Sequence, residues 1–334
     1  MSDPVLAIVF LAGMLVSLTA SWSLVTALER VGTRLGLSES LLGMLAALAA
    51  DGPEITAAVT ALVRGESRIG AGVILGSNVF NVAALIGLAG IVAGHIALHP
   101  RVVELGGAVA VWVAAVALLL VLGVLPAAAA LPAALVVFAP YLALLGARHS
   151  RIAALPLPAR WTRWLVAAIV EEEQDLQSAI HPRRGGARDG LVALVATAVV
   201  IGASIAMERS ASKLGAHWGV PAIVVGAIVL AVVTSLPNAV AGVYLASRGR
   251  GAAVLSTSLN SNAINIIAGL LVPSIFLGVA SPSAQTTLVA GSALAITLLA
   301  LLFARAGRGV GRGQGLTIVA VYLAVAATLI ATSS

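Results

Sequence analysis

The chain has 334 residues, of which 60% are hydrophobic and only 10% are charged. A soluble domain of this length needs more charge to keep its surface wetted, so the composition indicates a protein surrounded by lipid. The lack of cysteine excludes disulfides, thiolate metal sites and iron–sulfur clusters. The net charge of +6 does not indicate a nucleic-acid partner, because the basic residues lie in short loops between apolar stretches.

Ten apolar stretches are long enough, or nearly so, to cross a hydrocarbon core of about 30 Å. In chain order, they are Val5–Leu28, Ser40–Val63, Ile69–Ala93, Val102–Leu122, Ala127–Ala147, Leu191–Met207, Ala222–Ser247, Ala253–Val272, Thr286–Ala304 and Leu316–Ala331. The first is expected to be a retained span, because its start lacks the basic residues of a signal peptide. The sequence therefore predicts an all-α polytopic membrane protein with about ten transmembrane helices in two inverted five-helix repeats.

The only long polar segment runs from Arg148 to Asp189 and has five spans on each side. It divides the chain into a first membrane repeat at 1–147, a cytoplasmic linker at 148–189 and a second membrane repeat at 190–334. Its basic start, flanked by Trp161 and Trp164, could form an amphipathic helix on the membrane surface. The acidic run at 171–173 could sense cations weakly, but a solvated linker is favoured because blocks of like charge usually stay in water.

Basic residues are distributed unequally between the two sets of loops. If the N-terminus is outside, 15 of the 19 Lys and Arg residues lie in cytoplasmic loops. The outer loops then hold Arg64, Arg68, Arg209 and Lys213. Because cytoplasmic loops are enriched in Lys and Arg, we expect a multi-pass protein of the cell inner (plasma) membrane with both termini outside.

The two groups of five spans repeat each other in sequence. At a shift of 184 positions, the matches are Pro53 with Pro237, Arg64-Gly65 with Arg248-Gly249, Ser77-Asn78 with Ser261-Asn262, and Asn81 with Asn265. At a shift of 179 positions, Glu29-Arg30 and Leu35-Gly36 match Glu208-Arg209 and Leu214-Gly215. Because five is odd, the second half enters the membrane with opposite orientation. This is the plan of secondary transporters, whose sites lie at the midplane; an old duplication without transport is the alternative.

Two carboxylates interrupt the second span near its middle, in the sequence Asp51-Gly52-Pro53-Glu54. Pro53 cannot bond to the carbonyl of Ala49, and freed carbonyls are ligands for hard cations. Asp51 and Glu54 are three positions apart, so both side chains can face one side of a helix. Ionisable residues inside a membrane are costly and tend to be functional, although Asp51 could instead bond to a neighbouring helix.

Neutral oxygens occur at mirrored positions of the third and eighth spans. Ser77 and Asn81 are four positions apart, as are Ser261 and Asn265, so each pair shares a helix face. The seventh span carries Thr-Ser-Leu-Pro-Asn at 234–238, where the proline again frees a backbone carbonyl. Such amides can simply hold helices together. Two mirrored copies, each after a Pro-broken helix, favour an ion site.

These motifs resemble the alpha repeats of the calcium/cation antiporter superfamily, whose best-known branch is the sodium/calcium exchangers. The shared signature is Thr-Ser-Leu-Pro followed by an acid, then Gly-Ser-Asn-x-x-Asn, and it covers Asp51 to Asn81 and Ser235 to Asn265. The resemblance implies that Glu54 binds calcium and sodium. It implies sodium-binding roles for Ser77, Asn81, Ser261 and Asn265. It also implies that the first and sixth spans slide across the other eight to alternate access.

The chain departs from the family pattern in both repeats. The second-repeat glutamate of the family is Asn238 here, and the acid-or-amide position of the eighth span is the amide, Asn265. In the first repeat, Thr-Ser-Leu reads Ala-Asp-Gly at 50–52, so both carboxylates, Asp51 and Glu54, lie on the second span. Asp51 could restore the lost charge. It could instead indicate a changed ion, such as sodium or protons without calcium, or a changed stoichiometry.

The sequence predicts a secondary cation antiporter that exchanges calcium or another divalent cation for sodium or protons by alternating access. The expected metal-binding residues are Asp51, Glu54, Ser77, Asn81, Asn238, Ser261 and Asn265. The cations are cargo, so no cofactor is expected; the expected partners are inorganic cations and membrane lipid, without an obligate protein partner.

Three alternatives remain at this point. One is a monovalent sodium/proton-type exchanger of the same fold, and another is a non-transporting sensor or scaffold whose output is the linker. The third, an intramembrane hydrolase that uses Asp51 and Glu54 as an acid pair, is disfavoured. No histidine lies in a span near them, and the chain has no Gly-x-Ser-x-Gly or His-Glu-x-x-His motif. We therefore expect a transporter and not an enzyme.

Overall fold

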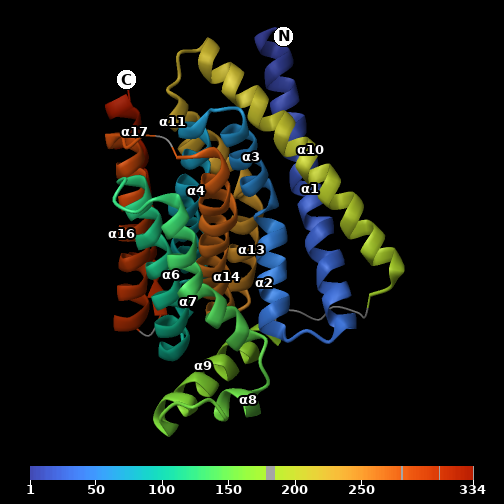
Figure 1. The fold of residues 1–334 in the computed structure, drawn as a ribbon, viewed down its shortest axis with the longest axis vertical. Coiled ribbons are helices and arrows are strands. Elements are labelled where there is room, and N and C mark those ends of the chain that lie inside the picture. The colour runs from blue at the N-terminus through green and yellow to red at the C-terminus, as the bar shows by residue number, and fades with distance from the viewer. Residues whose placement is uncertain (178–184, 280, 308, 334) are drawn as a thin grey trace.

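The computed structural model describes residues 1–177, 185–279, 281–307 and 309–333. Within these residues, eight helices are long and apolar enough to cross a membrane, and two bent helix pairs raise the number to as many as ten. The predicted all-α polytopic fold is therefore confirmed. Figure 1 shows the helices packed into an elongated bundle with both termini at the same end. Arg183, Arg184 and Arg308, which were counted among the loop charges, lie outside the described residues.

The two halves contain the same succession of helices. The first half comprises α1 (Asp3–Leu35), α2 (Glu39–Ala50), α3 (Gly52–Val63), α4 (Ser67–Asn81), the π-helix η1 (Val82–Leu88), α5 (Ala89–Ala93), β1 (His95–Ala97), α6 (Pro100–Val121) and α7 (Ala127–Leu145). The second comprises α10 (Ala187–His217), α11 (Ala222–Val224), η2 (Val225–Leu230), α12 (Ala231–Thr234), α13 (Leu236–Ser247), α14 (Gly251–Ile264), η3 (Asn265–Leu271), α15 (Val272–Leu277), α16 (Ala284–Ala306), β2 (Gly309–Gly311) and α17 (Arg312–Ser333). The short strands β1 and β2 pair antiparallel and join the two halves at one point.

The second and seventh spans are bent where the sequence predicts a break. The axis turns by 51° between α2 and α3 and by 46° between α12 and α13. Pro53 and Pro237 lie in the first turn of α3 and α13, where a missing backbone N–H costs nothing within the new helix. The proline therefore ends one helix and begins another, and the residues at each break are held away from regular helix geometry.

The third and eighth spans form the centre of the bundle. Their most apolar windows are 94% and 72% buried, compared with 17% for α17. Close packing requires small residues, because a Cβ atom at Gly76 would lie 2.3 Å from the carbonyl oxygen of Ala227. Both spans change from α-helix to π-helix at the last asparagine of the repeated motif, directly after Asn81 and at Asn265. Such π segments occur frequently at functional sites.

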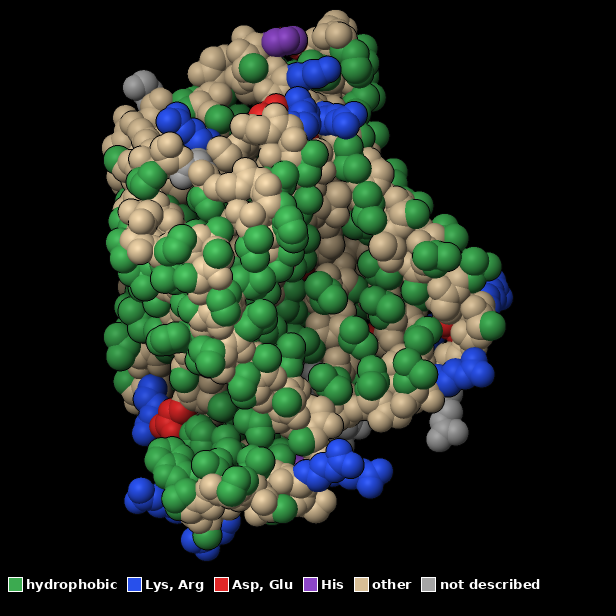
Figure 2. Space-filling view, viewed as in Figure 1, with side chains coloured by type: hydrophobic (Ala, Val, Ile, Leu, Met, Phe, Trp, Pro, Cys, Tyr) green, Lys and Arg blue, Asp and Glu red, His purple; other side chains and the backbone are tan. Residues whose placement is uncertain are grey.

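Helices α1 and α10 form a separate antiparallel pair that lies along one side of the bundle (Figure 1). Only 22% and 28% of their apolar windows are buried, so most of their surface is free to face lipid. Both helices are longer than the predicted spans, because they continue past Glu29 and Glu208. In Figure 2, hydrophobic side chains cover the middle of the visible face, while Lys and Arg lie mainly towards its edges.

The linker forms two helices, α8 (His149–Ala153) and α9 (Ala159–Gln177), at the end of the bundle away from the termini (Figure 1). The expectation that the acidic run is solvated is wrong for Glu172, which is 3% exposed and accepts a hydrogen bond from Ser256 on α14. Helix α9 is amphipathic, so one face of the run packs on the bundle. The flanking acids also have partners: Glu171 forms an ion pair with Arg101, and Glu173 contacts the ring of His149.

Candidate functional site

The bend in the second span places two acids at the junction of the two halves. Asp51 ends α2, and Glu54 lies in the first turn of α3. Both side chains are fully buried, with 0% exposure. A helix N-terminus favours negative charge, so the start of α3 is a suitable position for Glu54. Neither acid makes an ion pair with Lys, Arg or His among the described residues.

Asn238, the first-turn residue of α13, connects the two acids. Its side-chain amide donates to Asp51 Oδ1 at 2.8 Å and to Glu54 Oε1 at 3.5 Å. Glu54 and Asn238, which match each other at the shift of 184 positions, are therefore in contact. Ser261 on α14 also donates to Asp51, and Ser235 donates to Glu54 Oε1 at 2.9 Å. Side chains of the second half thus surround the two acids of the first half.

The third and eighth spans meet through a symmetric pair of amides. Asn78 Nδ2 donates to the backbone carbonyl of Asn262 at 3.0 Å, and Asn262 Nδ2 donates to the backbone carbonyl of Asn78 at 3.0 Å. Asn81 Nδ2 reaches Asn262 Oδ1 at 3.2 Å and Ser261 Oγ at 3.4 Å. The two repeats therefore meet at equivalent residues, as expected near a pseudo-two-fold axis.

Several buried oxygens around this junction have no hydrogen-bond partner within the described part of the chain. They are Asp51 Oδ2, Glu54 Oε2, Ser77 Oγ, Asn78 Oδ1, Asn81 Oδ1 and Asn265 Oδ1. Buried polar atoms are normally satisfied by protein groups, ordered water or ions, so these oxygens are free to bind water or a cation. Carboxylate, amide and hydroxyl oxygens are the ligands that Ca²⁺ and other hard cations prefer. Two buried carboxylates without a basic partner also require compensation, either by a bound cation or by protons.

The structure connects five of the seven predicted residues by direct hydrogen bonds: Asp51, Glu54, Asn81, Asn238 and Ser261. Ser77 and Asn265 are buried on the same central helices but bond to none of these five side chains. The role of all seven residues in ion binding stays a prediction. No group of three or more His, Cys, Asp or Glu residues is arranged for a metal in the described ranges, so any site here combines two acids with neutral oxygens.

Sequence reasoning missed Ser235, Asn78 and Asn262 as members of this network. The sequence contains a feature that points to each of them. Ser235 belongs to the Thr-Ser-Leu-Pro motif, and Asn78 matches Asn262 in the repeat. The i, i+4 spacing drew attention to Ser77 and Asn81 and away from the residue between them. Helix contacts within a bilayer involve more than one face of a central helix, and this explains the omission.

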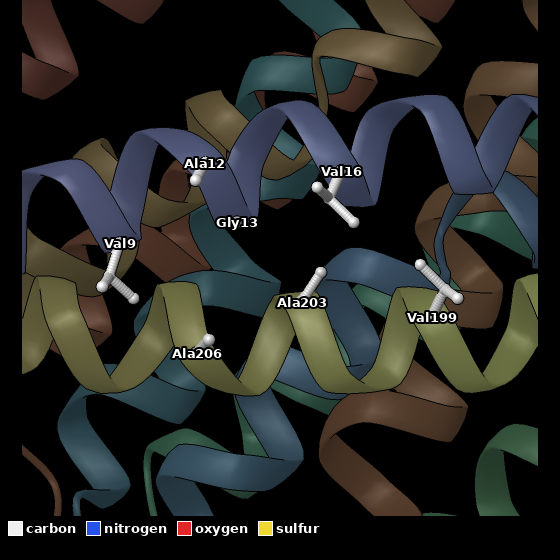
Figure 3. A pocket seen from close by; sticks show the side chains of 7 residues that line it. All are labelled: Val9, Ala12, Gly13, Val16, Val199, Ala203 and Ala206. Atoms are coloured by element: carbon white, nitrogen blue, oxygen red, sulfur yellow. The ribbon is translucent and has the colours of Figure 1, made fainter.

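A different cavity, of about 370 Å³, lies between α1 and α10 (Figure 3). Apolar residues and glycine line it: Val9, Ala12, Gly13, Val16, Val199, Ala203 and Ala206. These side chains offer no oxygen ligand for a cation. The residues suited to an ion are those at the junction of the bent spans.

A protein-family model described as sodium/calcium exchanger protein matches residues 5–148 and 190–331. The sodium/calcium exchanger MaX1 of Methanosarcina acetivorans is 30% identical over 131 residues, which is 39% of this chain and 37% of that protein. The matched segment therefore spans little more than a third of this relative's length.

Solved structures with the same fold align along almost the entire chain. The sodium-calcium exchanger NCX_Mj has a TM-score of 0.61 at 19% identity, covering 98% of this chain and 100% of that one. YfkE has a TM-score of 0.59 at 17% identity, covering 98% and 99%. At these identities the likeness concerns the fold, whereas the family match covers both repeats. The chain belongs to the sodium/calcium exchanger protein family.

Proposed function

We propose that the protein is a secondary antiporter that exchanges calcium or another divalent cation for sodium or protons. The observation that carries this proposal is the buried pair Asp51 and Glu54, which has no basic partner among the described residues and faces neutral side chains of the other repeat. A Lys or Arg side chain beside the two acids would neutralise them without a bound cation. Because no such side chain pairs with them among the described residues, cations or protons must neutralise the two carboxylates.

The proposed ligands are the seven predicted residues. Glu54 and Asp51 supply the charge, and each retains one oxygen without a hydrogen-bond partner in the described structure. Ser77, Asn81, Asn238, Ser261 and Asn265 supply neutral oxygens. Two carboxylates balance one divalent cation, whereas the six to eight oxygens that Ca²⁺ prefers must come mainly from amides, hydroxyls and backbone carbonyls. Sodium or protons bind to overlapping oxygens, which makes exchange obligatory.

The proposed mechanism is alternating access. Asp51, Glu54, Ser77 and Asn81 are each 0% exposed, so an ion held by them is sealed from both sides. Transport then requires a movement that opens one side at a time, and inverted repeats commonly provide it by moving one group of helices against the other. The pair α1 and α10, whose helices pack more extensively on each other than on the bundle, is the mobile group in this proposal.

A monovalent exchanger of the same fold is the second candidate, and the hydrogen bonds of Asn238 favour it. This amide donates to both acids, so part of their capacity for a cation is already used. A site with weakened negative potential would suit sodium or protons better than calcium. The proposed setting for either activity is the cell inner (plasma) membrane, with both termini outside and α9 in the cytoplasm, as the Lys and Arg distribution favours.

The test is a flux assay with the purified protein in liposomes. Gradients of calcium, magnesium, manganese, sodium and protons are imposed in turn, and the movement of each ion is recorded. Movement of a divalent cation that depends on an opposing sodium or proton gradient supports the first candidate. Coupled movement of sodium and protons alone supports the second, and no coupled movement of any ion would refute both.

A further inference from the structure

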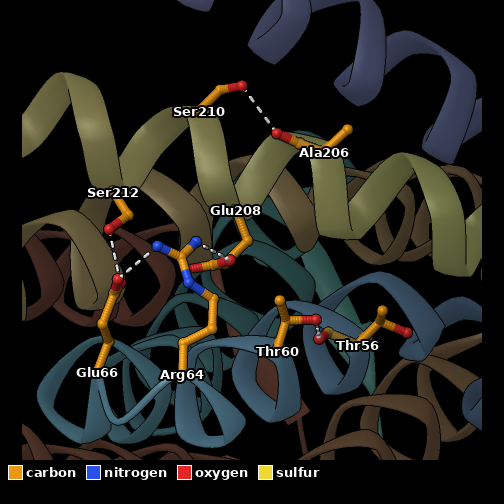
Figure 4. A network of polar contacts seen from close by, with 8 residues as sticks. All are labelled: Thr56, Thr60, Arg64, Glu66, Ala206, Glu208, Ser210 and Ser212. Carbon is orange, nitrogen blue, oxygen red and sulfur yellow. Dashed lines mark hydrogen bonds and ion pairs between the residues drawn. The ribbon is translucent and has the colours of Figure 1, made fainter.

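A second network of charges joins the helix pair to the bundle, away from the ion site (Figure 4). Arg64, at the end of α3, pairs with Glu208 of α10 at 3.4 Å and with Glu66 at 2.9 Å. Ser212 of α10 donates to Glu66 at 2.6 Å. Glu208 is 0% exposed, and a buried carboxylate depends strongly on its partner. The network therefore fastens α10 to the end of α3.

The internal repeat places a matching set of residues at the opposite end of the helix pair. Glu208 corresponds to Glu29 on α1 and Arg64 to Arg248 after α13, by the shifts of 179 and 184 positions. Glu66, the second carboxylate of the network, corresponds to Arg250. The chain therefore carries a carboxylate on α1 and two guanidinium groups beyond α13 that mirror the first network.

No member of this second set forms an ion pair with another described residue. Glu29 makes no ion pair with any described residue, and the Arg248 guanidinium lies over the ring of Tyr244 at 5.3 Å from its centre. Arg250 has a buried Nη1 without a hydrogen-bond partner in the described part of the chain. The anion and the cations that would complete the mirrored contact are thus both available.

Helices α10 and α1 also pack unequally on α3 and α13, and the more extensive contact is on the side of the first network. Helix α10 lies along α3, whereas its mate α1 contacts α13 only slightly. The two long helices pack most extensively on each other. Polar contacts join them along their length: His217 with Asp3 at 2.7 Å, Ser17 with Ser204 at 3.0 Å, and Arg30 with Asp189 at 3.2 Å. The two helices are therefore joined to each other along their length.

We propose that Arg64–Glu208 and Arg248–Glu29 are two alternating ion-pair latches. In the present state the first is closed and the second is open. When the pair α1–α10 slides, Glu208 leaves Arg64 and Glu29 reaches Arg248, because exchange of the two inverted halves gives each residue the surroundings of its repeat mate. The inference rests on the proposed alternating access, but it concerns residues that the ion does not touch.

The two latches are not equivalent. In the closed one, Glu66 shares Arg64 with Glu208, so two anions surround one cation. In the other, the position of Glu66 is taken by Arg250, so two guanidinium groups, Arg248 and Arg250, correspond to one carboxylate, Glu29. Because each ion pair stabilises only one of the two states, neither pair holds the helices permanently. Neutralising one carboxylate should therefore shift the population towards the state that the other latch holds.

The chain has no cysteine, so pairs of introduced cysteines can report the two states. The outer reporter is Arg64→Cys with Glu208→Cys, and the inner reporter is Glu29→Cys with Arg248→Cys. A short bifunctional thiol reagent is required, because a direct disulfide needs Cα atoms within about 7 Å. The control is Ser17→Cys with Ser204→Cys, whose side chains touch within the moving unit.

The experiment is done with the full chain in proteoliposomes under opposing ion gradients. We expect both reporters to crosslink. Ionic conditions that increase the crosslinking yield of one reporter should decrease the yield of the other, whereas the control should crosslink under all conditions. Either reporter, once crosslinked, should block cation flux, and cleavage of the crosslink should restore it. An inner reporter that never crosslinks, under conditions in which the outer one opens, would overturn the proposal.

Charge variants test the Arg248–Glu29 latch without introduced cysteines. Glu29→Gln and Arg248→Glu should each reduce flux severalfold, and Glu29→Arg combined with Arg248→Glu should restore most of it, because the exchanged charges attract again. No recovery in the exchanged variant counts against the latch. If the wild-type protein moves no cation while both reporters alternate, the proposed function is wrong and the latches remain supported. If the wild-type protein moves cations while the inner reporter never crosslinks, the latches are wrong and the proposed function remains supported.

Discussion

Asn238 donates its side-chain amide to Asp51 Oδ1 at 2.8 Å, across the junction between the two repeats. The sodium/calcium exchanger pattern has a carboxylate where this chain has Asn238, and it has no acid where this chain has Asp51. The acid and the amide have in effect changed places. Their direct contact makes Asp51 a candidate for the charge that the second repeat lacks, because both side chains are buried at this junction.

The contact predicts non-additive effects of exchanging the two residues. Asn238→Glu alone places three carboxylates together, and their repulsion should hinder ion release. Asp51→Ser alone leaves one acid, too little charge for a divalent cation. The double variant restores two acids, one per repeat, and should carry calcium faster than either single variant. Calcium flux of all four proteins in liposomes is the measurement. Additive losses without rescue would make Asp51 a structural residue and favour a monovalent native ion.

Glu54 should be indispensable for transport. Glu54→Gln retains the shape of the side chain and its bond from Ser235, but it removes the charge that a cation requires. We expect flux to fall to background while expression and thermal stability change little. Glu104→Gln is the matched control, because that glutamate is 40% exposed and pairs with Arg305. Wild-type flux in Glu54→Gln would show that the site is assigned incorrectly.

Gly76 should be essential for the packing of the central helices. A Cβ atom there would meet backbone atoms of Ala227 at 2.3–2.8 Å, and backbone cannot yield as a side-chain end can. Gly76→Ala should therefore destabilise the protein by about 1–3 kcal/mol. Gly202→Ala is the control, because nothing lies within 4 Å of its added Cβ. Melting temperatures in detergent give the comparison, and equal values for the two variants would contradict the predicted close approach.

The docking of α9 should depend on pH. Burial raises the pKa of the Glu172 carboxyl above its usual range, and the hydrogen bond from Ser256 opposes this only in part. A raised pKa means that the docked state prefers the protonated acid, so docking is strongest at low pH and weakens as pH rises through the raised value. Hydrogen exchange of residues 165–173 should therefore accelerate with pH beyond its intrinsic dependence.

Two variants isolate the effect of Glu172. Glu172→Gln should remove the additional pH dependence, because the buried group no longer titrates. Glu173→Gln should retain most of it, since the pair with His149 is partly exposed and contributes little. The same pH dependence in Glu172→Gln and in the wild type would assign it to another group.

Much of the fold follows from the sequence because a bilayer imposes simple requirements. Helices must satisfy their own backbone, so apolar stretches of sufficient length predict spans. Pro53 and Pro237 predict the two bends, since an interior proline removes a backbone hydrogen bond and can break the helix. Proline alone does not decide the outcome, because α7 continues through Pro132 and Pro140. The repeat predicts that Glu54 approaches Asn238, which the structure confirms at 3.5 Å.

Other features depend on tertiary packing that a linear pattern does not contain. Hydropathy ends the first and sixth spans at Leu28 and Met207, yet the helices continue to Leu35 and His217 because their polar ends still pack and pair. The acidic run suggests a solvated linker, but Glu172 is buried because its face of α9 meets α14. The same limitation hid Ser235, whose partner Glu54 lies in the other half of the chain.

Uphill transport tests the central claim most directly. Liposomes containing the protein are loaded with sodium or acidified inside, and calcium is supplied outside at the same concentration as inside. We predict that calcium accumulates against its own gradient while the imposed gradient lasts, and that Glu54→Gln abolishes this accumulation. Calcium that only equilibrates, or that accumulates equally in the Glu54→Gln variant, would contradict cation antiport through this site.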